Sequence, residues 1–427
     1  MSEFYTSVHL DESKCKGCIN CIKRCPTEAI RVRNGKAVIT TKYCIDCGEC
    51  IRQCKNHAKL PTHDSMDEIS RYKYTVALPA PSLYAQVNNL DDIDIVLTAL
   101  KDMGFDDVFE VSHAAEIVSA LSRKYVPAHK ENWPLISTAC PSVTRLIRVR
   151  FPNLIDHLLP IKPPMEIAAE MARKQAMQKT GLPSKDIGIF FLSPCPAKVT
   201  SVKSPLGYRH SDVDHVLSIK DIYPKLIASM KTVVEEDRVE ELSQTGNIGI
   251  SWGSSGGEAG GLLTDSYLAA DGIENVLKVL EDLEDQKFAN TLSFIELNAC
   301  HGGCVGGVLT VENPFLAKVK LKSLRKYIPI ARTHDAPDDI HPEWDEPVIY
   351  EPVFTLGDSM IQSLLLMKKV DELTASFPGL DCGSCGAPSC RALAEDIVRG
   401  NASEKDCIHV FREYIHKLSD EFSHLQQ

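Results

Sequence analysis

The chain has 427 residues, of which 44% are hydrophobic and 25% charged, the composition of a soluble globular protein with two or three domains. Its formal net charge of −11 disfavours a nucleic-acid binder held by phosphate contacts, and no run of 18 apolar residues predicts a membrane span. The first residues lack the apolar core of a secretion signal, so we expect a cytoplasmic protein. Its 16 cysteines therefore indicate metal or redox sites rather than disulfides.

Residues 1–62 contain a repeated cysteine pattern. Two runs of the form Cys-x2-Cys-x2-Cys-x3-Cys follow each other, although Lys55 replaces the proline expected after the second run. In bacterial ferredoxins with this spacing, the fourth cysteine of each run binds the other cluster. We predict a ferredoxin-like domain with two 4Fe–4S clusters, since the alternative of two zinc knuckles lacks the third cysteine of each run. The predicted ligands are Cys15, Cys18, Cys21 and Cys54 for one cluster and Cys44, Cys47, Cys50 and Cys25 for the other.

Residues 72–325 alternate short β-like runs with amphipathic segments, which is typical of an α/β domain. A helix is predicted from Asp91 to Met103, with Gly104 at its end. Ligands of open α/β sheets bind beyond the carboxyl ends of the strands, so polar and sulfur groups at those ends are expected to converge. Strands are predicted at 72–78, 105–111, 135–138, 187–192, 213–219, 247–252 and 293–298.

Four cysteines of this domain follow predicted strands. They are Cys140, Cys195, Cys300 and Cys304. Prolines flank the first two, and four glycines within 302–307 let the backbone approach a bulky group closely around the last two. Unrelated buried cysteines are the alternative, because free cysteine is a common core residue. The shared context favours one 4Fe–4S cubane held by all four. A further glycine-rich segment, 253–261, lacks the lysine of a phosphate loop and is expected to pack against this site.

Three segments resemble the signature motifs of the iron-only (FeFe) hydrogenases. They are Ser-Thr-Ala-Cys-Pro at 137–141, Ser-Pro-Cys-Pro-Ala-Lys at 193–198 and Glu-Leu-Asn-Ala-Cys-His-Gly-Gly-Cys-Val-Gly-Gly at 296–307. The segments 80–82 and 105–110 are also similar, so that the resemblance covers about residues 72–320. It implies a hydrogenase-like α/β fold, with the ferredoxin-like domain as a common partner of that core.

The resemblance also implies an H-cluster, which is a 4Fe–4S cubane bridged to a two-iron subsite that carries CO, CN and a bridging dithiolate. By position, the four cysteines of this domain would hold the cubane, and Cys304 would also bridge to the two-iron subsite. Lys198 and the segment Pro81–Ser82 would donate to cyanide ligands. Cyanide nitrogen is an anionic acceptor, which needs a fixed cation and fixed donors around it.

The sequence departs from the active family at several pocket positions. Ala139 stands where a cysteine relays protons to the dithiolate, and Ser122 stands where a proton-path glutamate usually lies. Ser193 and Asn298 replace two methionines near the two-iron site, and Met165 replaces a glutamine. These departures predict a slow enzyme, and they resemble the sensory subgroup of the family, in which the site senses H2 or redox state.

The C-terminal segment, residues 356–427, carries a third cysteine group. Its ligands would be Cys382, Cys385, Cys390 and Cys407. A zinc site with four cysteine ligands would also fit this spacing. The segment is similar to the small iron–sulfur domain of corrinoid and electron-bifurcating redox proteins, which favours a third accessory 4Fe–4S cluster. Helices are predicted at 357–370, at 391–399 and after Cys407, where we interpret an apolar pattern as packing. The acidic, proline-rich connector 326–355 either positions this cluster as an electron exit or wraps the catalytic domain.

The combined prediction is a cytoplasmic oxidoreductase of an anaerobe that interconverts H2 with protons and electrons. It implies a ferredoxin-like electron partner, hydrogenase maturation factors and a signalling partner protein. A non-catalytic hydrogenase-like protein for electron transfer or assembly, without the two-iron subsite, is the main alternative. Lys198 and the glycine-rich third motif argue against it, because those contacts serve the subsite. A third hypothesis is a reductase that takes electrons from a ferredoxin and acts on another substrate. The sequence has no G-x-G-x-x-G motif after a strand, so flavin or NAD binding lacks support.

Overall fold

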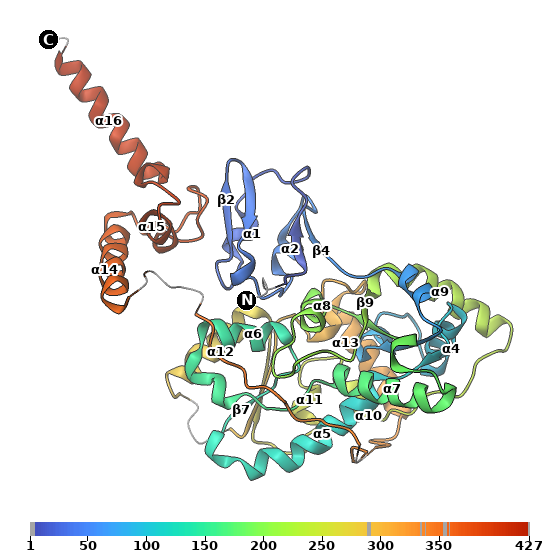
Figure 1. Ribbon diagram of the computed structural model, residues 1–427. Coiled ribbons are helices and arrows are strands. Elements are labelled where there is room, and N and C mark those ends of the chain that lie inside the picture. The colour runs from blue at the N-terminus through green and yellow to red at the C-terminus, as the bar shows by residue number, and fades with distance from the viewer. Residues whose placement is uncertain are drawn as a thin grey trace. The chain divides into compact units, whose positions relative to one another are not determined.

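The computed structural model in Figure 1 describes residues 5–287, 292–333, 335–337, 339–352, 357 and 359–425. The chain divides into two compact units, each made of segments that are distant in sequence. The larger unit comprises Met1–Ser7, Ile45–Gly48 and Pro61–Glu351, and the smaller unit comprises Val8–Cys44, Glu49–Leu60 and Pro352–Gln427. No helix among the described residues is long and apolar enough to cross a membrane.

Two parallel sheets form the framework of the larger unit. The first has the strand order β6 (Asp107–Val108), β5 (Tyr74–Pro79), β8 (Ile187–Ser193) and β9 (His215–Ser218). The second has the order β10 (Tyr267–Asp271), β11 (Phe294–Asn298) and β7 (Leu135–Ile136). Strand β8 is buried along its whole length, as expected for a parallel strand covered on both faces.

Helices cover both faces of the four-stranded sheet. Alternate residues of β5 enter different cores: Val76 and Leu78 belong to one core, and Ala77 belongs to the other. The first core includes apolar residues of α5 and α7, and the second includes residues of α4 and α9. The bounds of these helices are Val111–Ala128 for α5, Pro164–Thr180 for α7, Ile93–Asp102 for α4 and Ile219–Glu235 for α9.

Short helices begin at the carboxyl ends of several strands, and others complete the unit. The first group is α3 (Pro81–Tyr84), α6 (Pro141–Arg150) and α8 (Pro196–Lys203). The others are α10 (Asn247–Ser251), α11 (Gly257–Gly260), α12 (Ile273–Glu284) and α13 (Pro314–Leu324). Each helix of the first group has proline in its first turn, where a missing backbone N–H costs nothing.

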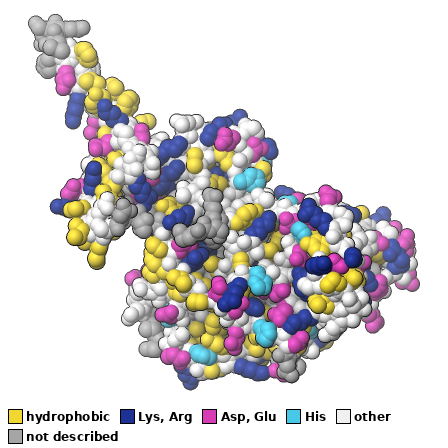
Figure 2. Space-filling model, in the orientation of Figure 1, with side chains coloured by type: hydrophobic (Ala, Val, Ile, Leu, Met, Phe, Trp, Pro, Cys, Tyr) yellow, Lys and Arg dark blue, Asp and Glu magenta, His cyan; other side chains and the backbone are white. Residues whose placement is uncertain are grey.

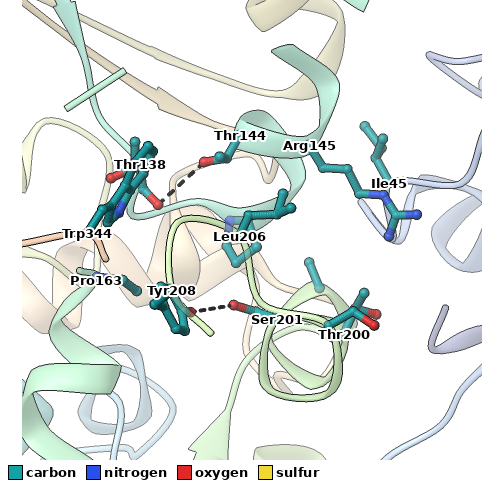
Figure 3. Close-up of a pocket in the computed structure, with 13 residues that line it drawn as sticks. Ile45, Thr138, Thr144, Arg145, Pro163, Thr200, Ser201, Leu206, Tyr208 and Trp344 are labelled. Carbon is teal, nitrogen blue, oxygen red and sulfur yellow. Dashed lines mark hydrogen bonds between the residues drawn. The ribbon is translucent and has the colours of Figure 1, made fainter. Parts of the chain in front are cut away.

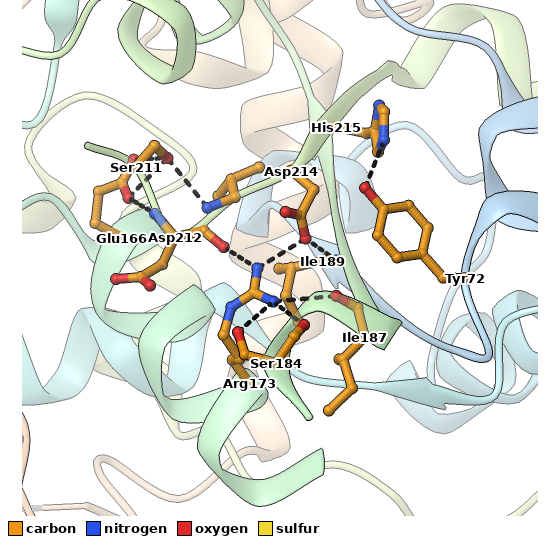
Figure 4. A network of polar contacts seen from close by, with 11 residues as sticks. Tyr72, Glu166, Arg173, Ser184, Ile187, Ile189, Ser211, Asp212, Asp214 and His215 are labelled. Carbon is orange, nitrogen blue, oxygen red and sulfur yellow. Dashed lines mark hydrogen bonds and ion pairs between the residues drawn. The ribbon is translucent and has the colours of Figure 1, made fainter. Parts of the chain in front are cut away.

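A polar network ties helix α7 to strand β8 and to the segment that precedes β9 (Figure 4). The Arg173 guanidinium donates to Asp214 Oδ2 at 2.7 Å and to the carbonyl oxygens of Asp212 and Ile187 at 2.8 and 3.0 Å. In the same helix, the buried Glu166 carboxylate accepts from the backbone amide of Asp212 at 3.0 Å. These bonds fix α7, which carries Met165, against this strand and this segment.

Most predicted elements are found, with one clear error. The strand predicted at 247–252 is the helix α10, and strand β10 was not predicted. A short apolar run does not separate a strand from a buried helix by its periodicity alone. At Gly249, a Cβ atom would lie 2.0 Å from the Ser112 carbonyl oxygen, so the glycine lets α10 pack directly on α5.

The described residues of 325–351 belong to the larger unit and are hydrogen-bonded to the rest of it. The backbone amides of Asn247 and Lys162 donate to the carbonyl oxygens of Pro329 and Pro342, both at 2.7 Å. The Glu116 carboxylate accepts from the amide of Arg332 at 2.9 Å. This part of the connector therefore packs against the domain that precedes it.

The smaller unit combines the N-terminal cysteine repeat with the C-terminal helices. Its short elements are α1 (Asn20–Lys23), α2 (Glu49–Gln53), the paired strands β1 (Val8–Leu10) and β4 (Lys59–Pro61), and the hairpin β2 (Ile30–Arg33) and β3 (Lys36–Ile39). The C-terminal helices are α14 (Met360–Ser376), α15 (Cys390–Val398) and α16 (Ile408–Leu425). The helix predicted at 391–399 is confirmed as α15, whereas that predicted at 357–370 is found later as α14, and residue 358 lies outside the described residues.

Helix α16 does not show the packing that its apolar pattern suggested. Ile408, Phe411 and Ile415 are 55%, 46% and 47% exposed within the described structure. Hydrophobic side chains lie at the surface along this helix in Figure 2. The remaining visible surface mixes acidic and basic side chains, as expected for a soluble protein.

Candidate active site

The carboxyl ends of four parallel strands supply the predicted site residues. Strand β5 leads to Pro81 and Ser82, and β7 leads to Ala139 and Cys140. Strand β8 leads to Cys195, and β11 leads through Asn298 to Cys300 and Cys304. Because these ends belong to both sheets, the site forms where the two carboxyl edges face one another.

A cavity of about 60 Å³ lies at this position. A single water needs roughly 10–15 Å³, so the cavity accepts a compact group several times larger. Among the predicted pocket residues, those that line the cavity are Pro81, Ser82, Ala139, Met165, Lys198, Asn298 and Cys304. Ser193 is not among the lining residues, and its hydroxyl instead donates to the Cys195 carbonyl oxygen at 2.9 Å and accepts from the Cys195 amide at 3.2 Å. It positions the cysteine loop.

Three of the cysteines lie within electrostatic reach of one another. Burial, together with the charge of the Cys140 sulfur, raises the pKa of Cys195 to about 11 and that of Cys304 to about 12. The Lys198 ammonium opposes this shift at both cysteines. Thiols that resist ionisation in an apolar pocket become thiolates when a metal cluster supplies compensating positive charge.

Two of these cysteines stand directly before helices. Cys140 precedes Pro141 at the start of α6, and Cys195 precedes Pro196 at the start of α8. Helix N-termini carry partial positive charge and free N–H groups, which favour an anionic group. The Pro-flanked cysteine motifs therefore place two of the predicted cluster ligands at positive helix ends.

Two polar groups of the cavity match the donors that an anionic ligand requires. Lys198 is buried, and its ammonium donates to the Ala139 carbonyl oxygen at 2.8 Å. Ser82 is fully buried, and its hydroxyl has no hydrogen-bond partner among the described residues. An orphaned buried hydroxyl is costly unless a bound acceptor satisfies it. The donor set and the cavity thus fit the group that the resemblance implies.

The glycines of the third motif are required by close backbone approach. Gly303 has φ of +87°, and a Cβ atom there would lie 2.4 Å from the Ser255 amide nitrogen. At Gly307, a Cβ atom would lie 2.1 Å from the Pro194 carbonyl oxygen. The segment 253–261 packs against the site through Gly253 and Glu258, which line the cavity, so the packing predicted for it is confirmed.

Two buried carboxyl groups at the cavity were missed by sequence reasoning. The Ser137 hydroxyl donates to Glu258 Oε2 at 2.5 Å, and Glu296 accepts from the amides of Gly256 and Ala259, both at 2.9 Å. Burial and the neighbouring Glu296 raise the pKa of Glu258. Burial also raises the pKa of Glu296, but the hydrogen bonds from the backbone amides lower it again in part. Glu258 is therefore the proton-holding member of the pair. An acidic residue in the apolar strand 293–298 was the available signal.

The two N-terminal cysteine runs share local geometry. Backbone amides of Ala37, Ala29 and Ala58 donate to the sulfurs of Cys15, Cys25 and Cys54 at 3.4, 3.2 and 3.2 Å. Such amide bonds to sulfur are the contacts that tune iron–sulfur clusters. Gly17 and Asp46 occupy equivalent places in the two runs, and both have positive φ, +67° and +51°. The internal repeat is thus a repeat of backbone conformation.

A second cavity of about 30 Å³ lies between the helices that begin at Cys140 and Cys195 (Figure 3). Arg145 of α6 and Thr200 of α8 line it, together with Ile45. The Thr200 hydroxyl donates to the buried Asp46 carboxylate at 2.6 Å, and Arg145 lies 4.0 Å from the same carboxylate. These bonds connect the segment Ile45–Gly48, which contains Cys47, to both helices within the larger unit.

The C-terminal cysteines lie around two turns with left-handed glycines, Gly383 with φ of +79° and Gly386 with φ of +80°. Among the residues with described positions, no three His, Cys, Asp or Glu side chains are grouped closely enough to share one metal ion.

An α/β core with cysteines, a buried lysine and an orphaned serine at its strand ends defines an iron–sulfur oxidoreductase of the hydrogenase class. The protein family described as "iron only hydrogenase large subunit, C-terminal domain" matches residues 73–268 and 261–308, which are more than half of the chain. The chain belongs to the iron-only hydrogenase family. A 4Fe–4S dicluster domain matches residues 7–55, and an Fe–S cluster family matches residues 377–409. The predicted fold class, with iron–sulfur domains at both ends of the core, is confirmed.

Two curated relatives agree with this assignment. Iron hydrogenase 1 of Clostridium pasteurianum is 24% identical over 389 residues, which cover 75% of this chain and 68% of that protein. The NADP-reducing hydrogenase subunit HndD of Solidesulfovibrio fructosivorans is 22% identical, with 70% and 64% covered. The chain thus spans about two thirds of the length of these relatives. A solved variant of FeFe-hydrogenase HydA1 from Chlamydomonas reinhardtii is 14% identical, with a TM-score of 0.46 over 67% of this chain and 98% of that chain.

Proposed function

We propose that this protein interconverts H2 with protons and electrons at an H-cluster, slowly, and that it serves as a sensor of H2 or redox state in the cytoplasm. The observation that carries the proposal is the cavity at the strand ends, where Cys304, Lys198 and the unpartnered Ser82 hydroxyl meet. This combination of a soft ligand, a cation and a free donor suits an anionic iron group with cyanide ligands.

When bound, the H-cluster supplies the redox iron chemistry at which H2 is split or formed. The proposed cubane ligands are Cys140, Cys195, Cys300 and Cys304. Lys198 and Ser82, which line the cavity, would hold and orient the two-iron subsite through their hydrogen-bond donors. Their burial excludes water, which strengthens each of these charged hydrogen bonds.

Proton delivery is the weak step in this proposal. Ala139 lines the cavity but cannot carry a proton, and Ser122 has no carboxyl group. Glu258 and Glu296 remain as the buried acid groups at the cavity wall, with Ser137 bonded to Glu258. A well-placed acid–base group contributes about 10²–10⁴-fold to the rate, and Ala139 cannot act as one. Proton transfer through the Glu258–Glu296 pair instead of a cysteine relay is therefore slower.

Electrons reach the site through the N-terminal clusters. Segment Ile45–Gly48, which contains Cys47, is bonded to α6 and α8, the helices that start at Cys140 and Cys195. A ferredoxin-like protein is the proposed external electron partner, maturation factors supply the two-iron subsite, and a signalling protein reads the output. The non-catalytic alternative keeps the cubane sites and lacks the subsite.

The test measures H2-dependent reduction of a viologen dye and H2/D⁺ exchange with the matured full-length protein under anaerobic conditions. We expect low but definite turnover that Lys198→Met abolishes. Lys203→Met is the matched control, since it makes the same change on the exposed end of the same helix and should leave turnover intact. Absence of turnover in a protein with full iron content would favour the non-catalytic alternative.

A further inference from the structure

The two iron–sulfur segments of the smaller unit contact each other although more than 350 residues separate them. The Val32 amide, on the edge of β2, donates to the Gly386 carbonyl oxygen at 2.8 Å. The neighbouring Arg33 side chain donates to the Cys385 carbonyl oxygen at 3.1 Å. The C-terminal cysteine loop is therefore bonded to the N-terminal hairpin through its backbone.

A buried ion cluster closes the same contact. The Asp396 carboxylate of α15, only 6% exposed, accepts from Arg31 Nε at 2.7 Å and from Arg33 Nη2 at 2.6 Å. Both arginines point to one side of β2, because they are two residues apart on a strand. Removing one partner from a carboxylate that is shielded from water and bonded to two guanidinium groups is costly, because it leaves a buried charge without compensation. This arrangement indicates a specific, built interface.

The cysteine loop also lies against the helix that carries a predicted cluster ligand. Lys23, two residues after Cys21 in α1, donates to the Pro388 carbonyl oxygen at 3.0 Å and to the Asp381 carbonyl oxygen. A Cβ atom at Gly383 would come within 3.3 Å of the Lys23 side chain. At Gly386, a Cβ atom would lie 2.0 Å from the Val32 carbonyl oxygen. Glycine at both positions permits the close approach of the two cysteine loops.

We propose that the C-terminal cluster docks on the N-terminal domain and exchanges single electrons directly with the cluster held by Cys15, Cys18, Cys21 and Cys54. In each transfer, one reduced 4Fe–4S core loses one electron and passes from the 1+ to the 2+ state. The other core gains that electron and passes from 2+ to 1+, and no atom changes place. The basic side chains Lys23, Arg31 and Arg33 lie in the contact between the two segments, where they would offset the repulsion between two anionic clusters. The inference rests on the proposed cluster ligands and not on hydrogen chemistry.

The experiment records pulsed EPR spectra of the reduced, cluster-loaded full-length protein, together with hydrogen exchange at the Val32 amide. We expect magnetic coupling of the reduced C-terminal cluster to the cluster held by Cys15, Cys18, Cys21 and Cys54, besides the coupling within the N-terminal pair, and strong protection of this amide in the unsubstituted protein. Asp396→Arg should abolish the coupling of the C-terminal cluster, keep that of the N-terminal pair, and speed Val32 exchange at least tenfold. Adding Arg31→Glu and Arg33→Glu to that variant should restore both. Asp371→Asn is the control, because it removes an exposed ion pair with Arg391 elsewhere in the C-terminal part.

Unchanged coupling and unchanged Val32 exchange in Asp396→Arg, with iron content retained, would overturn the proposal. If Asp396→Arg lowers the iron content, Val32 exchange decides alone, since it reports the contact without the cluster. H2 turnover is measured in parallel on the same samples. Absent turnover with intact coupling refutes the hydrogenase proposal only, whereas turnover without coupling refutes the docked cluster only.

Discussion

The Lys198 ammonium donates a hydrogen bond to the carbonyl oxygen of Ala139 at 2.8 Å. The cation of the cavity is thus anchored to the backbone of Ala139, the residue at which we propose that a proton relay is missing. Because the bond uses the carbonyl group, the side chain at this position can change without releasing Lys198. A substitution at Ala139 can therefore test the proposed relay without removing the cation.

Ala139→Cys should raise H2 turnover about tenfold or more, since a thiol at the cavity wall restores a proton carrier. The measurement is H2 evolution per matured active site, with CO and CN band intensities used to normalise the samples. Ala139→Ser is the control for side-chain size. Flat turnover in the cysteine variant would show that the missing relay does not limit the rate.

Glu258→Gln should lower turnover at least tenfold and remove the fall in turnover on the alkaline side of the pH profile. Burial and Glu296 raise the pKa of Glu258, so its carboxyl group stays protonated near neutral pH and can donate. Proton donation should therefore weaken as pH rises through that raised pKa. A Glu258→Gln profile identical to that of the parent protein would exclude Glu258 from the proton path.

Glu166 should make the larger unit less stable at alkaline pH. Burial raises the pKa of its carboxyl group from 4.5 to about 7, so the folded chain holds a proton that the unfolded chain releases. This stabilisation is complete below pH 4.5 and is lost as pH rises through 7, with a maximum of about 3 kcal/mol. Denaturation midpoints measured anaerobically at pH 5.5 and 8 should differ less in Glu166→Gln. The exposed Glu284→Gln should keep the parental difference.

Gly303→Ala should lower the iron content of the catalytic domain and abolish turnover. A Cβ atom there would clash with the Ser255 amide nitrogen at 2.4 Å, and the residue needs φ of +87°. Gly181→Ala is the matched control, because Gly181 also has positive φ, +70°, but has no atom within 4 Å of a Cβ position. Equal iron contents in both variants would mean that close packing at Gly303 is dispensable.

Much of the site was predictable from the sequence because its chemistry is encoded in short motifs. Pro-flanked Cys140 and Cys195 and the glycine-rich segment of Cys304 lie where strand–helix alternation places them. The strand predicted at 247–252 failed because Ile248 and Ile250 are both buried in a short helix, which mimics alternation. Strand β10 was missed because its sequence, Tyr-Leu-Ala-Ala-Asp, has little β-branched character.

Features that depend on contacts between distant residues could not be predicted from local sequence patterns. Glu258 gains its role only through burial beside Glu296, which lies 38 residues further along the chain. The contact of Asp396 with Arg31 and Arg33 joins opposite ends of the sequence, and no periodicity predicts such a pair. Sequence spacing identifies cluster ligands, whereas their arrangement depends on tertiary contacts.

The most direct test of the account is infrared spectroscopy of the full-length protein after maturation with the two-iron subsite. We predict bands from iron-bound CO and CN, with CN bands that shift in Lys198→Met because that substitution removes a cationic donor from the cavity. Lys203→Met should leave these bands unchanged. Absence of CO and CN bands in a competently matured sample with full iron content would contradict the central claim that this cavity holds an H-cluster.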